Sequence, residues 1–219
     1  MKIVEPYARM LDFTAEDGIA ALKKIEAIGR VSHRSEDRQT EDSWRRFIPS
    51  VVIGHGDLSI IEHVSVTVEA EVDRGITHEW VRHRIGAYTQ ESTRFVNYDK
   101  PGWEVRFILP PALVDDEPAR QSWLLATGAA VVAYRKLLTS QPPQIARSVL
   151  PNALASKLIV TYNLRSWRHF FIMRTTKETH PQMRQMTIPL LDEFKAKVPI
   201  LFEDIMPNMK QSEAMRLVR

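Results

Sequence analysis

Basic and hydroxyl-bearing side chains are concentrated in one short stretch of the sequence, residues 77–97, which reads THEWVRHRIGAYTQESTRFVN. It contains the tripeptide Arg82-His83-Arg84, followed by a polar loop that ends in Ser92, Thr93 and Arg94. Arginine and hydroxyl side chains suit the oxygen atoms of phosphate and ribose, because each donates directed hydrogen bonds. The stretch therefore predicts a binding site for a phosphorylated small molecule that carries a heterocycle.

A purely structural role for Arg82-His83-Arg84 is the alternative. Residues 76–81 have helical spacing, and Gly86 is expected to end that helix because glycine tolerates the left-handed cap conformation. The three basic residues would then lie on the last helical turn. Cations at a helix C-terminus contribute about 0.3–1 kcal/mol, so they would serve only as a cap.

Arg174 is a second candidate functional residue. Trp167, Phe170, Phe171 and Arg174 have the spacing i, i+3, i+4 and i+7 on a helix predicted over residues 167–176 with Ser166 as its N-cap. A guanidinium on an apolar face costs several kcal/mol unless it is paired. Two interpretations stay open: Arg174 extends to water or to an internal carboxylate, or it meets a ligand.

The elements that must position these residues follow from their hydrophobic periodicity. Strict alternation over residues 61–73 predicts a half-buried strand, and weaker alternation predicts a strand over 155–163. Further strands are expected at 95–98 and 103–109, and a loop at 32–42. Helices are expected at 15–29 with Thr14 as N-cap, 41–53 with a kink at Pro49, 118–138 capped by Asp115 or Asp116, 143–150, and 183–209. Because no repeat or linker interrupts the chain, we expect one α+β domain over residues 1–219.

Composition narrows the classes of function. The 219 residues are 44% apolar and 26% charged, with a net charge of +3 and no cysteine. The lack of cysteine excludes disulfides, thiolate metal sites and a cysteine nucleophile. The seven histidines form no spaced metal-binding motif with carboxylates, so no metal is expected. No signal peptide and no apolar run of ~20 residues is found, which predicts a cytoplasmic protein without a membrane partner. The mild net charge of +3 fits a small anionic ligand better than a nucleic acid.

Several motifs together resemble one family. Arg82-His83-Arg84, seven further residues and then Ser92 resemble the signature of the flavin-dependent thymidylate synthases. Other segments match the family in the same order: Arg30-Val31-Ser32, His55-Gly56, Ile61-Glu62-His63-Val64, Ala146-Arg147-Ser148-Val149-Leu150-Pro151 and Asn163-Leu164-Arg165-Ser166. The resemblance covers residues 30–200. It implies an α+β fold with a central, mostly antiparallel sheet flanked by helices.

The resemblance also implies an activity. Family members convert dUMP to dTMP by methylating C5, with FAD as cofactor and with methylenetetrahydrofolate and NADPH as co-substrates. They do so as homotetramers whose active sites are shared between subunits. The resemblance suits a chain without cysteine, because this family is thought to act without a cysteine nucleophile. The flavin would supply the hydride that no side chain can donate. An arginine beside the pyrimidine would stabilise the anion that makes C5 nucleophilic.

The family's roles carry over by position. Arg174 resembles the catalytic arginine, and Ser92 and Arg94 are expected to face the phosphate. The predicted dUMP contacts are Glu79, Trp80, Val81, Arg82, Gln90, Glu91, Ser92, Thr93, Arg94, Arg147 and Arg174. The predicted FAD contacts are Ser59, Arg82, His83, Arg84, Gln90, Asn163, Leu164, Arg165 and His169. Two of these residues also have purely structural alternatives. Arg147 would pair with an acidic neighbour, and Asn163 would be a turn residue at a strand end.

The chain also departs from the family at two positions. Asp57 stands where a histidine is common, which affects the stacking of the folate or flavin ring, and His169 stands where some members have asparagine. Two other functions stay open. One is a related enzyme that methylates UMP in nucleoside-antibiotic pathways. The other is a non-catalytic nucleotide- or RNA-binding protein, which a bound flavin would exclude.

Overall fold

The computed structural model describes residues 1–218, and the chain divides into two compact units. Unit 1 comprises Met1–Tyr7, Ala70–Arg82 and Tyr88–Ile159. Unit 2 comprises Ala8–Glu69, His83–Ala87 and the described residues from Val160 onward. The single domain expected from the sequence stays a prediction. Within residues 1–218, no helix has the length and apolar character needed to span a membrane.

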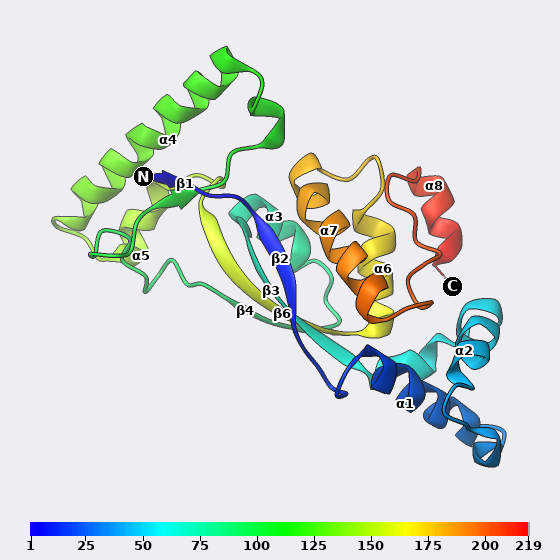
Figure 1. The fold of residues 1–219 in the computed structure, drawn as a ribbon. Coiled ribbons are helices and arrows are strands. Elements are labelled where there is room, and N and C mark those ends of the chain that lie inside the picture. The colour runs from blue at the N-terminus through cyan, green and yellow to red at the C-terminus, as the bar shows by residue number, and fades with distance from the viewer. Residues whose placement is uncertain (219) are drawn as a thin grey trace. The chain divides into compact units, whose positions relative to one another are not determined.

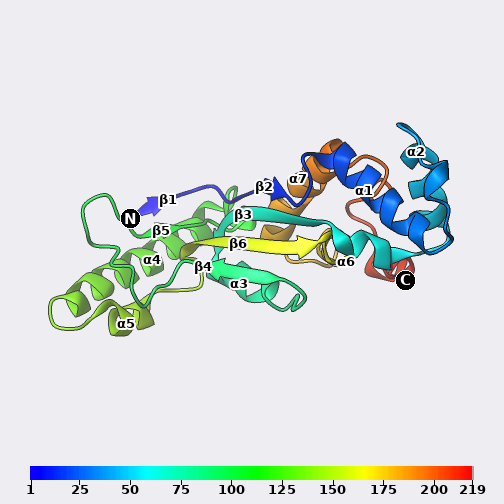
Figure 2. The same cartoon turned by 90° about the horizontal axis from the view of Figure 1, so that it is seen from below.

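The main sheet is antiparallel and has four strands, in the order β2–β3–β6–β4 (Figure 2). These are β2 (Tyr7–Phe13), β3 (Ser65–Asp73), β6 (Ala155–Asn163) and β4 (Ala87–Gln90). Val66, Val68 and Val72 of β3 are buried, as the alternation predicts. A separate parallel pair joins β1 (Lys2–Ile3) to β5 (Arg106–Phe107). The antiparallel sheet with flanking helices confirms the predicted fold class.

In unit 1, helices pack with the sheet residues around a small core. Helix α4 (Glu117–Leu138) begins where the Asp116 carboxylate accepts a hydrogen bond from Ala119 N, one of the two predicted caps. Helix α5 (Pro143–Ala146) continues as a 3-10 turn (Arg147–Val149), close to the prediction. Helix α3 (Arg74–Trp80) is capped by Asp73. The buried core comprises Tyr98, Val105, Phe107, Val131, Tyr134, Ala146 and Leu154.

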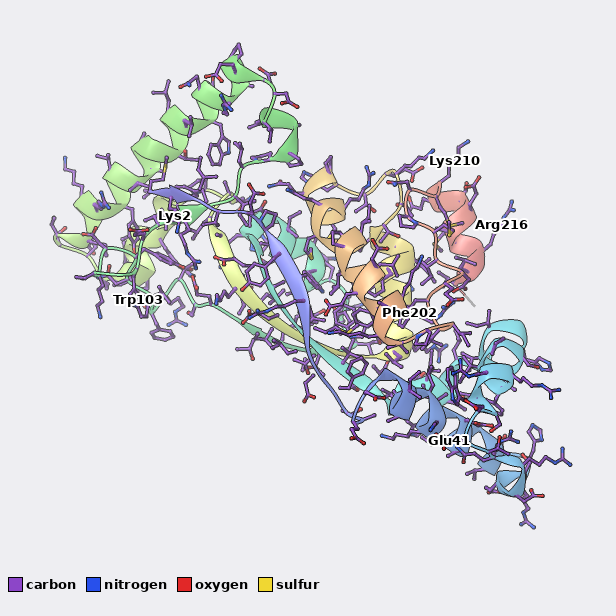
Figure 3. All side chains as sticks on the ribbon, in the orientation of Figure 1. Lys2, Glu41, Trp103, Phe202, Lys210 and Arg216 are labelled. Atoms are coloured by element: carbon purple, nitrogen blue, oxygen red, sulfur yellow. The ribbon has the colours of Figure 1, made fainter. Side chains whose placement is uncertain are left out.

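In unit 2, the core is built from aromatic rings on the C-terminal helices. Helices α6 (Leu164–Arg174), α7 (Pro181–Lys197) and α8 (Gln211–Ala214) lie side by side (Figure 1). Phe202, which is labelled in Figure 3, follows α7. Its ring packs against those of Phe171 and Phe194. The rings of Trp167 and Phe171 are stacked at 5.7 Å between centroids, so the predicted aromatic stripe of α6 is buried.

The N-terminal part of unit 2 differs from its predicted outline. Helix α1 (Gly18–Val31) is capped by Asp17, whose carboxylate accepts from Ala20 N, and not by Thr14. Helix α2 (Trp44–Phe47) is short and is followed directly by a π-helical segment (Ile48–Gly54), in which the helix is wider. The widening coincides with Pro49, which cannot donate a backbone hydrogen bond to the preceding turn. A 3-10 helix (Leu58–His63) then precedes β3, where a strand was expected from residue 61.

Several predictions around the basic stretch are also wrong. Helix α3 ends at Trp80, so Arg82-His83-Arg84 lies beyond it and does not cap it. Gly86 is not among the glycines with positive φ, and the expected polar loop contains β4. Helix α6 begins at Leu164 with Asn163 as its cap, three residues before the predicted start. The expected strand at 95–98 is irregular, with turns at its two ends, and that at 103–109 is reduced to β5.

Candidate functional site

The predicted site residues fall into two groups, one in each unit. Unit 1 contains all the predicted nucleotide contacts except Arg174. Unit 2 contains all the predicted flavin contacts except Arg82 and Gln90, and it also contains Arg174.

A turn after β4 presents consecutive backbone donors. Phe95 N and Val96 N both donate to Ser92 O, at 3.1 and 3.0 Å, which closes the turn. Within residues 1–218, the amides of Ser92, Thr93 and Arg94 donate to no other atom. Successive unpaired N–H groups of this kind bind anions. The exposed Arg94 adds a positive charge there, with its guanidinium carbon 5.4 Å from the centroid of the Phe95 ring.

Arg147 lies against the same turn. Its Nη1 donates to the Thr93 hydroxyl at 2.9 Å, although the two residues are 54 positions apart in sequence. Among the described residues, no carboxylate pairs with Arg147, so the acidic partner of the structural alternative is not found. The buried Thr93 therefore joins a half-buried arginine to the turn that carries Arg94.

Glu91 anchors the start of this turn to the core of unit 1. Its carboxylate accepts a hydrogen bond from Tyr98 Oη at 2.6 Å, and Arg106 lies 3.8 Å from its other oxygen. Burial, together with the Glu91 carboxylate, raises the pKa of Tyr98, so its hydroxyl stays a donor. Tyr98 N in turn donates to Tyr134 Oη at 3.2 Å. The carboxylate of Glu91 thus ties the turn to the hydrophobic core.

Gln90 is the last residue of β4, and two hydroxyl groups hold its side chain. Its Nε2 donates to Thr77 Oγ1 at 3.0 Å and to Ser156 Oγ at 3.1 Å. Both partners are completely buried. Neither residue is predictable from the sequence, because a lone threonine in a helix and a serine in a strand carry no distinctive signal.

The other predicted residues of unit 1 differ in their accessibility. Trp80 is completely buried, and its carbonyl oxygen accepts from Tyr88 Oη at 3.2 Å. Glu79 and Val81 are half-buried, whereas the side chain of Arg82 is exposed. The exposed Arg82 can reach a ligand, and Trp80 mainly anchors the end of α3.

In unit 2, Arg174 pairs with His83. Arg174 Nε donates to His83 Nε2 at 2.9 Å, so this ring nitrogen carries no proton. The His83 ring also packs edge-on against Phe170 at 5.0 Å and lies 5.9 Å from the ring of His169. Burial, followed by the nearby Arg174 charge, lowers the pKa of His83 from 6.5 to about 4. His83 is therefore neutral at physiological pH, and the positive charge of the pair belongs to Arg174.

A close backbone contact holds the His83 segment against the end of β6. Tyr162 Oη donates to the carbonyl oxygen of His83 at 3.4 Å. A Cβ atom on Gly86 would lie 2.1 Å from Cδ1 of the Tyr162 ring. Only glycine fits at this position, which gives Gly86 a packing role in place of the predicted cap.

The predicted flavin residues of unit 2 surround the start of α6. Arg165 Nη1 pairs with Glu62 at 2.5 Å, and Glu62 shares its 3-10 helix with the exposed Ser59. The Asn163 oxygen caps α6 by accepting from Ser166 N at 2.8 Å, a helix-capping role rather than the turn role considered from the sequence. Leu164 is completely buried, and its amide donates to Val64 O.

The hydrogen-bond donors near the start of α6 suit a dinucleotide that carries a planar ring. Arg84 is exposed and has no partner among the described residues, and Arg165 is likewise exposed, so both can meet phosphate oxygens. His169 adds an imidazole that is accessible to solvent, and its partial desolvation, followed by the charge of Arg174, lowers its pKa. The residues present are therefore compatible with a flavin nucleotide. No group of three or more potential metal-ligating side chains gathers within residues 1–218.

The sequence and the fold both have known relatives. Residues 16–200 match the family of thymidylate synthase complementing proteins. The chain is 33% identical to the flavin-dependent thymidylate synthase of Mycobacterium tuberculosis, over 87% of this chain and 81% of the relative. It is 32% identical to that of Pyrococcus furiosus, over 83% of this chain and 73% of the relative.

A solved structure extends the likeness to the fold. The UMP/dUMP methylase PolB from Streptomyces cacaoi, crystallised with 5-Br dUMP, superposes with a TM-score of 0.78. The match covers 93% of this chain and 96% of that protein at 23% sequence identity.

Proposed function

This chain belongs to the flavin-dependent thymidylate synthases, and we propose that it methylates dUMP at C5 to form dTMP. It is an enzyme of the pyrimidine-nucleotide C5 methyltransferase type that uses a flavin. FAD as the flavin, methylenetetrahydrofolate as carbon donor and NADPH as reductant are the finer parts of the proposal. Transfer of the one-carbon unit from methylenetetrahydrofolate needs the C5 carbon of the nucleotide to become nucleophilic.

The observation that carries the proposal is the anion-binding turn at Ser92, Thr93 and Arg94. Three amides that donate to no atom of residues 1–218, the exposed Arg94 and the neighbouring Arg147 offer donors and positive charge to one small anion. A nucleoside monophosphate carries such an anion at its 5′ end. We assign the 5′-phosphate of the nucleotide to this turn.

Arg174 supplies the electrostatic step. A guanidinium stays protonated throughout the physiological pH range, and a fixed positive charge beside uracil stabilises the anion that makes C5 nucleophilic. The neutral His83 accepts from Nε and thereby fixes the plane of the guanidinium. Because His83 carries no competing charge, it orients Arg174 without repelling it.

The flavin residues have separate roles. Arg84 and Arg165 would hold the phosphates of the cofactor, and Asn163 and His169 would contact its polar edges. When bound, the flavin supplies the hydride that reduces the transferred one-carbon unit to a methyl group. Before Arg165 can hold a phosphate, its pairing with Glu62 must be shared or broken.

A direct assay tests the function. The purified protein, loaded with FAD, is mixed with dUMP, methylenetetrahydrofolate and NADPH, and dTMP is measured. Parallel reactions without each component show whether all are needed. UMP in place of dUMP tests the related specificity of the PolB type. Absence of any methylated product with either nucleotide would contradict the proposal.

A further inference from the structure

The side chain of Gln90 is held at one end only. Its Nε2 donates to the buried hydroxyls of Thr77 and Ser156, at 3.0 and 3.1 Å. Within residues 1–218, its Oε1 accepts no hydrogen bond. All three residues belong to unit 1, so α3, β6 and β4 meet at this amide.

The bonding of Thr77 decides which end of the amide faces inward. A threonine hydroxyl has one proton, and Thr77 donates it to Arg74 O at 2.9 Å. Only lone pairs of Thr77 therefore face Gln90. The Gln90 oxygen in that position would oppose them, whereas the NH₂ group satisfies them. The nitrogen is thus directed inward, and the carbonyl oxygen is left to accept from another molecule.

We propose that Thr77 and Ser156 are positioning residues, which present the Gln90 carbonyl oxygen to a hydrogen-bond donor of the bound nucleotide. This rests on the proposed function, in which the phosphate binds at the turn that starts two residues after Gln90. dUMP has two suitable donors, the 3′-hydroxyl of its deoxyribose and the uracil N3–H. A loose amide would present its NH₂ group part of the time and repel either donor.

Nucleotide titration of the flavin-loaded protein tests the anchors. Thr77→Val keeps the shape of the side chain but removes its acceptor, and Ser156→Ala removes the other. Each should weaken dUMP binding about 3- to 10-fold, the change expected for one neutral hydrogen bond. Thr77→Ser, which keeps the hydroxyl, should bind dUMP as the unmodified protein does.

Thr127→Val is the matched control. Thr127 is also a buried helical threonine of unit 1, and its hydroxyl donates to Trp123 O at 2.8 Å. The substitution removes the same kind of backbone hydrogen bond without contacting Gln90. It should change the melting temperature as Thr77→Val does but leave dUMP binding unaltered. Equal loss of dUMP affinity in both variants would overturn the proposal.

A double-mutant cycle shows whether Thr77 acts through Gln90. In a Gln90→Ala background, Thr77→Val should cause no further loss of dUMP affinity. Fully additive losses would overturn the positioning role while leaving the enzyme's function intact. Failure of the unmodified protein to bind dUMP would instead overturn the proposed function and this inference with it.

Two nucleotide analogues distinguish the donors. 2′,3′-Dideoxyuridine monophosphate lacks the ribose hydroxyl, and N3-methyl-dUMP lacks the ring donor. Binding of the analogue that lacks the relevant donor should become insensitive to Gln90→Ala. If Gln90→Ala weakens both analogues as much as it weakens dUMP, Gln90 does not accept from the nucleotide.

Discussion

At the scale of single residues, Arg174 carries the positive charge of the Arg174–His83 pair, and the neutral His83 orients it. Arg174 was singled out from the sequence because it shares a helix face with aromatic residues. The structure gives it a neutral imidazole as one of its contacts. The sequence left open that Arg174 meets an internal carboxylate, whereas its Nε bonds to a histidine ring. Two predictions separate the charge of Arg174 from the neutrality of His83.

The first prediction concerns Arg174. Arg174→Ala should lower turnover by about two to three orders of magnitude, the usual cost of removing one preorganised electrostatic donor. Arg174→Lys should recover little of the lost turnover. A lysine ammonium lacks the planar set of donors with which the guanidinium can bond His83 and face a ligand at the same time. Single-turnover conversion of dUMP, with reduced flavin and methylenetetrahydrofolate, measures the effect.

Arg168 provides the contrast on the same helix. It is buried and bonds both oxygens of Asp204, at 2.8 and 2.7 Å. Arg168→Ala should therefore reduce thermal stability more than Arg174→Ala does. Near-normal turnover in Arg174→Ala would contradict the catalytic role. A large fall in its melting temperature, with equal loss of every ligand, would indicate a structural arginine.

The second prediction concerns pH. The folded state holds the pKa of His83 at about 4, and the unfolded chain returns it to 6.5. Between these values the unfolded chain binds more protons, so His83 makes stability fall as pH drops from 6.5 to 4. Above 6.5 its contribution is constant. The loss should be about 1–2 kcal/mol, allowing for solvent screening of a ring that is only partly buried.

Urea unfolding at several pH values measures this effect. His83→Gln keeps an acceptor for Arg174 but does not titrate, so its stability should fall less between pH 6.5 and 4. An identical pH dependence of the two proteins would show that His83 is not the titrating group.

At the scale of elements, the turn after β4 and the segment before it carry most of the site. The sequence shows the polar and basic side chains of this region but does not predict its backbone. β4 is short, and its side chains alternate only between exposed and half-buried positions. An edge strand of this kind lacks a fully buried face, so hydrophobic periodicity cannot indicate it. The three amides of the turn could not be predicted either, because they depend on backbone conformation and not on residue type.

The third prediction tests the turn as a phosphate site. Arg94→Ala should weaken binding of dUMP by roughly 2–4 kcal/mol, as expected when one side of a charge-assisted contact is lost. Binding of deoxyuridine, which lacks the phosphate, should change little. Calorimetric titration of both ligands measures the difference. Arg45→Ala, at an exposed arginine of unit 2, controls for the loss of net charge. Equal losses for nucleotide and nucleoside would remove Arg94 from the phosphate.

The fourth prediction tests the segment that carries His83 and Arg84. Gly86→Ala would put a methyl group into the Tyr162 ring, so the segment must shift. We expect weaker flavin binding, seen as lower flavin absorbance per protein after gel filtration. Gly128→Ala is the matched control, since its Cβ meets no atom within 4 Å. That change should leave flavin content unaltered and should stabilise α4 by about 0.5–1 kcal/mol. Full flavin content in Gly86→Ala would contradict the role of this contact.

Whole-element patterns were predictable where burial is regular along the chain. The strand at 155–163 and the buried face of β3 followed from alternation, and α4 from its apolar sides and its aspartate cap. The start of α6 was misjudged because Asn163 and Ser166 are both good N-caps, and tertiary packing buries Leu164. The N-terminal strands were missed because β1 has two residues and only Met10 of β2 is fully buried.

At the scale of the whole molecule, the proposed homotetramer would give the exposed apolar side chains a partner. Helix α4 exposes 75% of Leu125 and 68% of Val132, which lie two turns apart on one face. Contact with another subunit would remove these two side chains from water. This supports an oligomer without specifying how its subunits contact one another.

The last prediction tests whether active sites are shared between subunits. At a dUMP concentration that saturates only the unmodified enzyme, Arg94→Ala subunits should be nearly inactive alone because they bind dUMP weakly, and Arg174→Ala subunits because their turnover is low. If each site takes Arg94 from one subunit and Arg174 from another, random mixed oligomers should contain both native arginines in about a quarter of their sites. Activity should therefore reappear after the two variants are dissociated and reassembled together. A mixture of Arg174→Ala with Arg174→Lys serves as the control, because neither subunit can supply the missing guanidinium. If the first mixture stays as inactive as its components, although light scattering shows mixed oligomers, each active site takes both arginines from a single chain.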